Sequence, residues 1–563
     1  MYGIIATTVL ASKNATLNLT MVKSIFALLY SRQSSILSSA YILMATTILA
    51  KILGLIRDRL LAHVFAPEKI DIFWAAFRLP DLIFQIVILG ALSVAFIPVF
   101  TESLEHKGKE DAFDMARAVL NVFLLIFIMT TVLIYIFAHP IVSSIIAPGF
   151  TPDRQNQVVA LTRIILFGQV ILVLGSFFIG ILQSFQRFII PAFAPVFYNF
   201  GIILGIIFLT NSFGVAGAAF GVILGAILHV LIQVPIILMV GFKFKFPPKF
   251  SHPGVKEILR LMSVRTLGLS AEQINETVGV NLASWVSGGV TALTYAQHLQ
   301  VVPISLFGAN LAIAALPVLS SERTRGKIEE FKITLLTTMH QILFLTLPAT
   351  AILIVIRIPV VRLVFGASQF NWQATVLTGA TLAYLAIGLA AQSISLLLVR
   401  GFYALKDTKT PVLVSLIVVF LNIFLSLYFI KILRLDVWSI GLANSIAALL
   451  SGVLLFIFLH FKVGKFNLNQ VLMPLLKMVM ATVIMGVALY IPIKLLDQVI
   501  FDTTRTVNLL LLTGLSSLFA LSIYVFLVWF LKVRELDTYV DLVKRLGKLR
   551  AKVKSSEIIS DPL

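Results

Sequence analysis

The sequence of 563 residues contains no cysteine, and charged residues make up only 12% of it. The absence of cysteine excludes disulfides, thiolate catalysis and cysteine-based metal sites. A typical soluble domain carries roughly 25% charged residues, so this chain has too little polar surface to cover a water-soluble globule. With 59% hydrophobic residues and a mean hydropathy of +1.02, the composition excludes a soluble enzyme, a coiled coil and a disordered protein. It predicts a polytopic α-helical membrane protein.

Sequence motifs for nucleotide, metal and covalent chemistry are also absent. The chain has no G-x-x-x-x-G-K-[ST] phosphate loop, no G-x-S-x-G and no H-E-x-x-H. The eight histidines are scattered, and no two of them have metal-ligand spacing on one helix. We therefore expect a protein that is not an enzyme and that has no metal site and no cofactor. A coupling cation is left open.

Apolar runs of about 20 residues, long enough to cross a bilayer as helices, recur along the chain. They predict an all-α polytopic membrane protein with about 14 transmembrane helices, arranged as two parallel six-helix halves plus two extra C-terminal helices. The expected segments are an N-terminal extension (1–35), an N-terminal six-helix half (36–243), a cytoplasmic linker (244–256), a C-terminal six-helix half (257–463), two additional transmembrane helices (464–532) and a basic cytoplasmic tail (533–563).

Positive charge dominates, because 44 Lys and Arg residues stand against 25 Asp and Glu residues, for a net charge of +19. In a soluble protein this balance would suggest nucleic acid, but in a membrane protein basic residues collect in cytoplasmic loops and meet anionic lipid. If the N-terminus is inside, the inner loops hold about twice as many Lys and Arg residues as the outer loops. We therefore expect a plasma-membrane protein with both termini in the cytoplasm and no nucleic-acid partner.

Several landmarks recur along the chain at a nearly constant spacing. The paired positions are Pro98 and Pro317, Pro191 and Pro411, and Phe150 and Phe370, and the three separations agree to within a single position. This agreement indicates an internal repeat of six spans, so that each half begins on the same side of the membrane. Transporters built from such parallel repeats bind substrate between the halves and expose it alternately to each side.

Ionisable side chains within the spans are costly in lipid, and by default they face a cavity. The candidate substrate-binding residues are Lys51, Arg57, Arg78, Arg265 and His298, and the candidate charge-balance or gating residues are Asp58, Asp71, Glu272 and Glu276. Arginine suits a phosphate because its planar guanidinium donates two parallel hydrogen bonds. The alternative interpretation is internal ion pairing, for example between neighbouring Arg57 and Asp58.

A set of motifs, spread in order from about residue 35 to 530, is similar to the MurJ/MviN family of lipid II flippases. The motifs are Gly54-Leu55-Ile56-Arg57-Asp58, Asp71-Ile72-Phe73-Trp74-Ala75-Ala76-Phe77-Arg78-Leu79-Pro80, Gly90-Ala91-Leu92-Ser93, Ala95-Phe96-Ile97-Pro98, Ala147-Pro148-Gly149-Phe150, Ile190-Pro191-Ala192-Phe193-Ala194-Pro195, Tyr295-Ala296, and Gly401-Phe402-Tyr403 through Lys409-Thr410-Pro411. The resemblance implies a fourteen-helix fold of the multidrug/oligosaccharidyl-lipid/polysaccharide exporter superfamily. It also implies that the chain moves the undecaprenyl-diphosphate-linked peptidoglycan precursor, lipid II, from the inner to the outer leaflet.

The resemblance further implies a central cationic cavity for the diphosphate and sugars, and a groove involving the last two helices for the lipid tail. The chain departs from the family pattern where family members usually have charged residues: the positions are Lys51, Phe84, Leu89 and Gln297-His298. As an imidazolium, His298 would restore the cation that the family usually carries there.

These observations predict a lipid II flippase that works by alternating access. We expect it to act as a monomer that contacts a lipid-linked oligosaccharide diphosphate and membrane lipids. The alternatives are a flippase for another polyprenyl-linked glycan, a cation-coupled multidrug exporter and a non-transporting membrane scaffold. A multidrug exporter would favour carboxylates and aromatic residues in its cavity, and the retained Arg57 and Arg78 argue against it.

Overall fold

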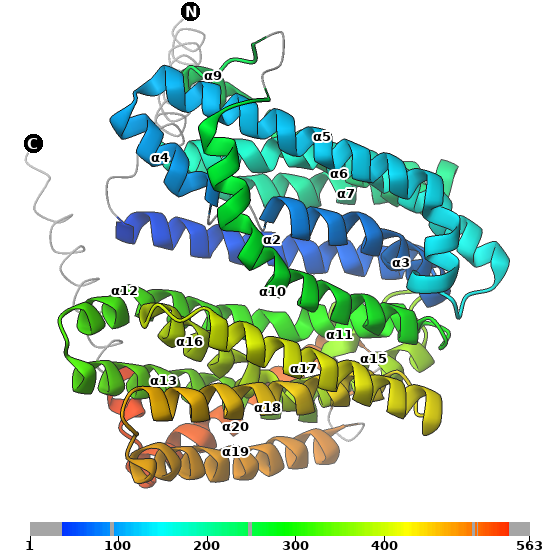
Figure 1. Cartoon of the computed structure of the whole chain (residues 1–563). Helices are drawn as coiled ribbons and strands as arrows, with labels where there is room; N and C mark the ends of the chain where they lie inside the picture. The colour runs from blue at the N-terminus through cyan, green and yellow to red at the C-terminus, as the bar shows by residue number, and fades with distance from the viewer. Residues whose placement is uncertain (1–35, 90–94, 246–249, 498–500, 504, 540–563) are drawn as a thin grey trace, which may run out of the picture. The chain divides into compact units, whose positions relative to one another are not determined.

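The computed structural model describes residues 36–89, 95–245, 250–497, 501–503 and 505–539. The predicted extension at 1–35, the motif at 90–93 and most of the predicted tail, 540–563, lie outside these residues. Within the described part the regular elements are helices, apart from one isolated bridge between Asp497 and Phe501. The all-α prediction is therefore confirmed for the described residues (Figure 1).

The chain divides into two compact units, Met1–Trp285 and Val286–Leu563. The first unit contains α2 (Ile36–Val64), α3 (Pro67–Phe84), the π-helix η1 (Gln85–Leu89), α4 (Ile97–His106), α5 (Lys109–Ile141), the π-helix η3 (Val142–Ile146), α6 (Pro152–Ser184), α7 (Ile189–Phe213), α8 (Val215–Leu231), α9 (Val234–Val240) and α10 (Pro253–Ala283). Packing thus groups α10 with the first unit, whereas the boundaries predicted for the two halves remain predictions.

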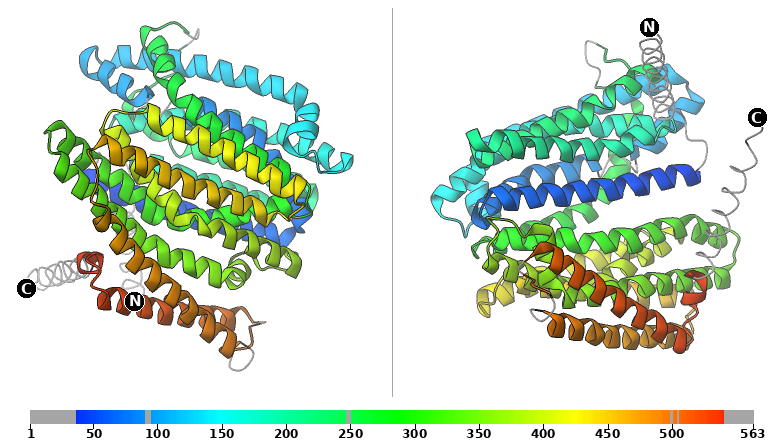
Figure 2. Two further views of the ribbon diagram at one scale, coloured as in Figure 1. Left: turned by 60° about the horizontal axis from the view of Figure 1, so that its bottom comes forward. Right: turned by 180° about the vertical axis from the view of Figure 1, so that it is seen from behind.

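The second unit follows the same helical plan. It contains α11 (Gly289–Pro303), the π-helix η4 (Ile304–Ala309), α12 (Asn310–Thr324), α13 (Ile328–Val355), α14 (Arg357–Phe365), α15 (Trp372–Ile387), α16 (Leu389–Ala404), α17 (Lys409–Leu427), the π-helix η5 (Tyr428–Ile432), α18 (Trp438–Lys462), α19 (Leu468–Leu496) and α20 (Thr506–Phe530). Figure 2 shows its C-terminal pair, α19 and α20, packed side by side.

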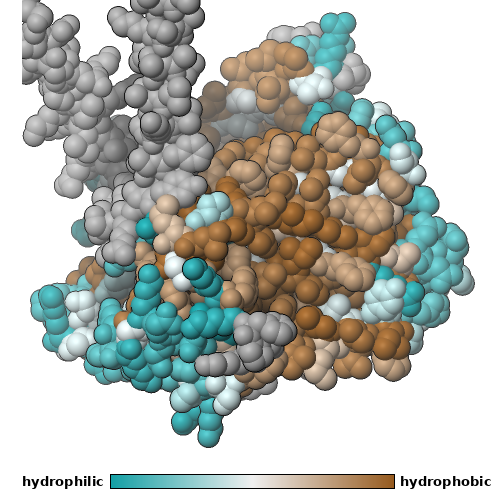
Figure 3. Space-filling view, turned by 90° about the horizontal axis from the view of Figure 1, so that it is seen from above, coloured by the Kyte–Doolittle hydropathy of each residue, from teal (hydrophilic) through white to brown (hydrophobic). Residues whose placement is uncertain are grey.

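Ten helical segments of the described chain are long and apolar enough to cross a membrane, four in the first unit and six in the second. The bent pair α15 and α16 would make an eleventh. Helices α2, α3 and α10, which contain most of the charged candidate residues, are not among the ten. Figure 3 shows a broad apolar surface bordered by polar residues, as expected where side chains face lipid rather than water.

Backbone landmarks recur at the spacing of the sequence repeat. The starts of α5 and α13, of α6 and α15, and of α7 and α17 keep the spacing of the sequence landmarks to within a single position. The π-helices η1 and η4 begin at the same spacing. Residues with a positive φ angle also recur at this spacing: Gln186 corresponds to Lys406, and Gly214 corresponds to Arg434. The two copies therefore share helix boundaries and turn geometry.

The bent pair in the second unit turns by 44° at Gly388. A break inside a membrane-spanning helix leaves backbone groups that need new partners. Here the N–H of Gly388 donates to the hydroxyl of Ser445, at 2.9 Å. The carbonyl of Leu385 accepts from the side-chain amide of Gln300, at 2.6 Å. Polar residues of α11 and α18 thus stabilise the break.

Glycines allow α7 and α8 to pack backbone against backbone. Gly201 and Gly205 on α7 oppose Gly225 and Gly221 on α8. A Cβ atom at Gly205 would lie 2.2 Å from the Cα of Gly221, closer than real Cβ contacts allow. Small residues four apart are a recurrent means of helix association in membranes, because they let the backbones make extensive van der Waals contact.

We predict that Gly205→Ala lowers stability by about 1–3 kcal/mol, because the added methyl group overpacks the α7–α8 contact. Thermal unfolding followed by tryptophan fluorescence would measure the change. The matched control is Gly514→Ala in α20, where nothing lies within 4 Å of the added Cβ and where alanine favours the helix over glycine. Equal loss of stability in both variants would contradict the packing role.

The turn before α17 is organised by one carboxylate. Asp407 accepts hydrogen bonds from the backbone N–H groups of Lys409 and Thr410, both at 3.0 Å, and from the Thr410 hydroxyl at 2.6 Å. It also forms an ion pair with Lys462 at the end of α18. Burial alone would raise the pKa of Asp407, but the hydrogen bonds from Lys462 and Thr410 outweigh it and lower the pKa to about 2.

Since folding lowers this pKa, the ionised Asp407 contributes stability that is complete above its unfolded pKa and is lost as the pH falls through the folded one. We predict that Asp407→Asn lowers stability by about 2 kcal/mol at neutral pH. The difference from wild type should shrink as the pH falls from about 4 to about 2. Melting temperatures measured across this range would test it, with Asp502→Asn, an exposed aspartate of the same unit, as the control. A pH-independent difference would refute the assignment.

Candidate functional site

The structure places most of the candidate residues in the first unit. Helix α2 contains Lys51, Arg57 and Asp58, helix α3 contains Asp71 and Arg78, and helix α10 contains Arg265, Glu272 and Glu276. The side chain of Arg265 lies outside the described part of the chain. His298 is half-buried on α11, in the second unit. The candidate residues of α2, α3 and α10 thus all belong to the first unit.

Arg57 is held by partners from three helices. Its guanidinium contacts the Asp58 carboxylate at 2.9 Å and donates to the side-chain carbonyl of Asn199 on α7 at 3.1 Å. The guanidinium carbon lies 5.0 Å from the ring centroid of Trp74 on α3, within the range of a cation–π interaction. Asp58 is 1% exposed and Arg57 12%. The predicted pairing of these neighbours is present, and α7 adds a neutral acceptor.

Lys51 lies about two turns before Arg57 on α2 and is half-buried. It makes no ion pair with an acidic residue in the described part of the chain. Of the candidate cations of the first unit with described side chains, Lys51 thus differs from Arg57 and Arg78, each of which contacts a carboxylate. An ammonium carries three donors on a flexible stem, so Lys51 can turn toward an incoming anion.

Among the described residues, the hydrogen bonds of Arg78 all go to α10. Its Nε donates to the Thr277 hydroxyl at 3.0 Å, and one terminal nitrogen donates to the Glu276 carboxylate at 2.6 Å. The other terminal nitrogen donates to both the backbone and side-chain carbonyls of Gln273, each at 2.7 Å. Arg78 is 7% exposed, whereas Glu276 is 44% exposed. We call Arg78, Gln273, Glu276 and Thr277 the Arg78 cluster.

Two further carboxylates act electrostatically on the Arg78 cluster. Glu272 interacts with both Arg78 and Glu276, and so does Asp81, which also forms a hydrogen bond with Gln85. Tyr198 on α7 interacts electrostatically with both Arg57 and Asp81. We call the charged groups of α2, α3 and α10 described above, together, the polar region of the first unit.

A proline helps to shape α3 near this region. Pro80 has no N–H, so the carbonyl of Ala76, four residues earlier, has no helical donor. The fully buried hydroxyl of Thr162 on α6 donates to that carbonyl at 3.2 Å. A polar side chain of a neighbouring helix thus satisfies the freed backbone group, as membrane interiors require.

Asp71, at the start of α3, is fully buried and pairs with a residue that the sequence did not single out. Arg154 of α6 lies 3.3 Å from its carboxylate and donates to the backbone carbonyl of Glu68 at 2.9 Å. The guanidinium carbon of Arg154 lies 4.3 Å from the ring centroid of Phe150. Phe150 belongs to the Ala147-Pro148-Gly149-Phe150 motif, so this motif helps to position the partner of Asp71.

Sequence reasoning missed Arg154, Asn199, Gln273 and Thr277. Arg154 is not among the charged residues that the sequence places within a span, and only its place in the first turn of α6 brings it to Asp71. Asn199 and Thr277 are neutral polar residues of a kind found in many helices, so they give no signal in one sequence. Gln273 lies one turn before Thr277 and next to Glu272, and this polar run was the only clue.

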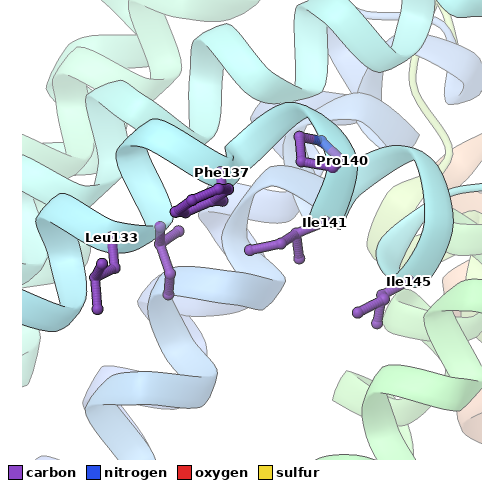
Figure 4. A pocket seen from close by; sticks show the side chains of 6 residues that line it. Leu133, Phe137, Pro140, Ile141 and Ile145 are labelled. Carbon is purple, nitrogen blue, oxygen red and sulfur yellow. The ribbon is translucent and has the colours of Figure 1, made fainter.

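A pocket of about 430 Å³ lies elsewhere in the first unit, along the bent end of α5 and η3. Figure 4 shows the apolar side chains of Leu133, Phe137, Pro140, Ile141 and Ile145 that line it. None of the candidate residues contributes to it. In the described part of the chain no group of three or more His, Cys, Asp or Glu residues has the geometry of a metal site. The polar region is therefore the candidate site.

Breaking the Asp71–Arg154 pair is predicted to destabilise the protein. Arg154→Gln removes the cation beside a fully buried carboxylate and should cost about 3 kcal/mol, measured from the thermal unfolding midpoint. Lys69→Gln serves as the control, since it removes the same charge at an exposed position where the ammonium only contacts Gln157. Exposed contacts of that kind contribute about 0–1 kcal/mol. A larger loss for the Lys69 variant would contradict the assignment.

The helices, the repeat and the ion pairs inside the first unit define a multi-pass helical membrane protein of the transporter class. Comparison with known proteins gives the family. The model of the lipid II flippase MurJ family matches residues 61–510, and the chain belongs to this family. It is a multi-pass membrane protein of bacterial type.

Individual relatives agree with the family. The chain is 30% identical over 457 residues to the probable lipid II flippase MurJ of Rhizobium meliloti (strain 1021), covering 79% of this chain and 85% of that protein. It is 28% identical over 433 residues to the lipid II flippase MurJ of Burkholderia cenocepacia, covering 73% of this chain and 81% of that protein.

Solved structures show the same fold. A lipid II flippase MurJ in an inward closed conformation matches with a TM-score of 0.71 and 25% identity, over 86% of this chain and 98% of that one. An inward-facing multidrug resistance MATE family transporter of the MOP superfamily matches with a TM-score of 0.65 at 16% identity, over 76% of this chain and 98% of that one. The second likeness concerns the fold alone.

Proposed function

We propose that this protein moves lipid II from the inner to the outer leaflet of the bacterial plasma membrane and so supplies cell-wall synthesis. The observation that carries the proposal is the match to the lipid II flippase MurJ family over residues 61–510. The likeness to a lipid II flippase structure over 86% of the chain supports it. The protein makes and breaks no covalent bonds in this process, so it acts as a transporter and not as an enzyme.

The proposed architecture is fourteen transmembrane helices, with both termini in the cytoplasm and the last two helices outside the repeat. Ten or eleven of these helices are supported by length and composition, and α2, α3 and α10 would be spans whose charged residues face a cavity. The protein acts as a monomer by alternating access, the mechanism typical of transporters built from repeats.

The diphosphate of the substrate needs cations, and the proposed ligands begin with Lys51 and Arg57 on α2. Asp58 and Asn199 fix the plane of the Arg57 guanidinium, and Lys51 adds a second positive charge about two turns away. Arg265 and His298 are the other proposed ligands. Asp58, Asp71, Glu272 and Glu276 would balance these charges or take part in gating, since unpaired charges are costly in a bilayer.

The membrane potential or an ion gradient would drive the cycle. Each elementary charge that crosses the potential changes the free energy by about 2.3 kcal/mol per 100 mV. A substrate with a diphosphate, carried past fixed cations and carboxylates, feels this field. The coupling ion is left open, and no resident cofactor is proposed.

A rescue experiment tests the function. Bacteria depleted of their own lipid II flippase should survive on this protein, because it would restore the supply of lipid II to the outer leaflet. Lys51→Ala, Arg57→Ala and His298→Ala should reduce rescue and lipid II flipping in vesicles by about tenfold or more, the loss expected for one charge-assisted hydrogen bond. His298→Arg should retain both, since it keeps a cation in place.

The outcomes separate the competing functions. A wild-type protein that is produced and inserted but does not rescue would contradict lipid II flipping. Vesicle assays with a multidrug cation or with another polyprenyl-diphosphate glycan would then distinguish an exporter from a flippase of different specificity. Inactivity toward all three would leave the non-transporting scaffold. Equal, wild-type activity of His298→Ala and His298→Arg would remove His298 from the site.

A further inference from the structure

The Arg78 cluster differs from the other cationic positions of the first unit. Among the described residues, all four hydrogen bonds of Arg78 go to side-chain or backbone oxygens of α10. Each of its three guanidinium nitrogens has an acceptor, and the side chain is 7% exposed. Arg78 thus uses four of its five N–H donors on α10. Among the described residues, Arg57 uses three of its five on Asp58 and Asn199, so it keeps more donors for a phosphate oxygen.

The charge around Arg78 also disfavours an anionic ligand. Glu276 contacts the guanidinium directly, and Glu272 and Asp81 act on it electrostatically. One cation thus faces three carboxylates on α3 and α10. Like charges repel strongly where water is scarce, so an approaching diphosphate would meet more negative than positive charge here. Lys51 on α2 has no carboxylate partner in the described part of the chain and is better suited to an anion.

The same bonds fix α10 in its C-terminal half. At its first turn, His252 accepts the N–H of Gly254 and lies 3.4 Å from Asp111 of α5. At its last turn, Asn281 donates to the backbone carbonyl of Ile145 at 2.7 Å. Just after α10, the hydroxyl of Ser284 accepts a hydrogen bond from the backbone N–H of Gly149, at 3.1 Å. Between these ends, Arg78 connects α10 to α3.

We infer that Arg78 is a positioning residue, which fixes α10 against α3, and that it is not a ligand of the transported anion. This inference rests on the proposed function only for its transport readout. The predicted role of Arg78 as a substrate-binding residue is thereby revised to a role that acts through α10. Lys51 and Arg57 then carry the anion-binding role in the described part of the first unit.

Replacing both members of the pair tests the inference. Arg78 is buried although Glu276 is partly exposed. Removing one partner of an ion pair with a buried member leaves an uncompensated charge, whereas replacing both by apolar residues of similar volume is often neutral. Arg78→Met should lower the melting temperature and reduce lipid II flipping in vesicles by about tenfold or more. Arg78→Met combined with Glu276→Met should restore the melting temperature and bring the affinity for lipid II in nanodiscs to within about threefold of wild type.

The matched control is Arg78→Met combined with Glu272→Met. It has the same net charge, but Glu272 acts on Arg78 only through electrostatic interaction. This control should not restore either property. Equal recovery in both double variants would overturn the inference, because net charge rather than the specific contact would then decide stability.

Two other results would overturn it. If the Arg78→Met, Glu276→Met variant recovers its melting temperature but binds lipid II about tenfold more weakly than wild type, Arg78 is a ligand. If the melting temperature does not recover, the pair does not fix α10. Failure of the proposed function is distinguishable, because the wild-type protein would then neither bind nor flip lipid II while the melting temperatures still report on the contact.

Discussion

The need to compensate each charge inside a helical bundle dominates the first unit. Moving a charged group out of water costs far more free energy than a single hydrogen bond returns. A charge therefore persists inside the bundle only where partners surround it. Helix α3 is the centre of this arrangement: Asp71 pairs with Arg154 of α6, and Arg78 pairs with Glu276 of α10. Charge compensation thus helps to decide which helices contact α3.

Much of the fold could be predicted from the sequence, because apolar runs, and the proline and glycine residues that mark helix ends and turns, are local signals. The repeat was visible in landmarks such as Pro191 and Pro411, and the structure adds the shared left-handed turns at Gln186 and Lys406. The count of about fourteen spans went beyond what length and composition support. The remaining spans of that count are α2, α3 and α10. Their charged residues lower their hydropathy, although the proposed function requires them to cross the membrane.

The candidate site was harder to predict, because its geometry depends on contacts between residues that are far apart in the chain. Composition could identify Arg78 and Glu276 as unusual, yet their contact joins positions 198 residues apart. Neutral partners such as Asn199 leave no trace in the charge pattern.

Phe84 shows a different change, at a position where the family usually has a charged residue. Its side chain is 8% exposed and belongs to the apolar core of the first unit. A lost charge is thus replaced there by packing.

The bend at Gly388 has no counterpart at the matching position of the first unit. Gly168, which occupies that position in the first copy of the repeat, lies within the continuous helix α6. The two copies of the repeat thus share their boundaries but differ at this position, where one has a continuous helix and the other has two helices joined at an angle. A jointed helix can change direction at a single residue, so the two copies are built to deform differently.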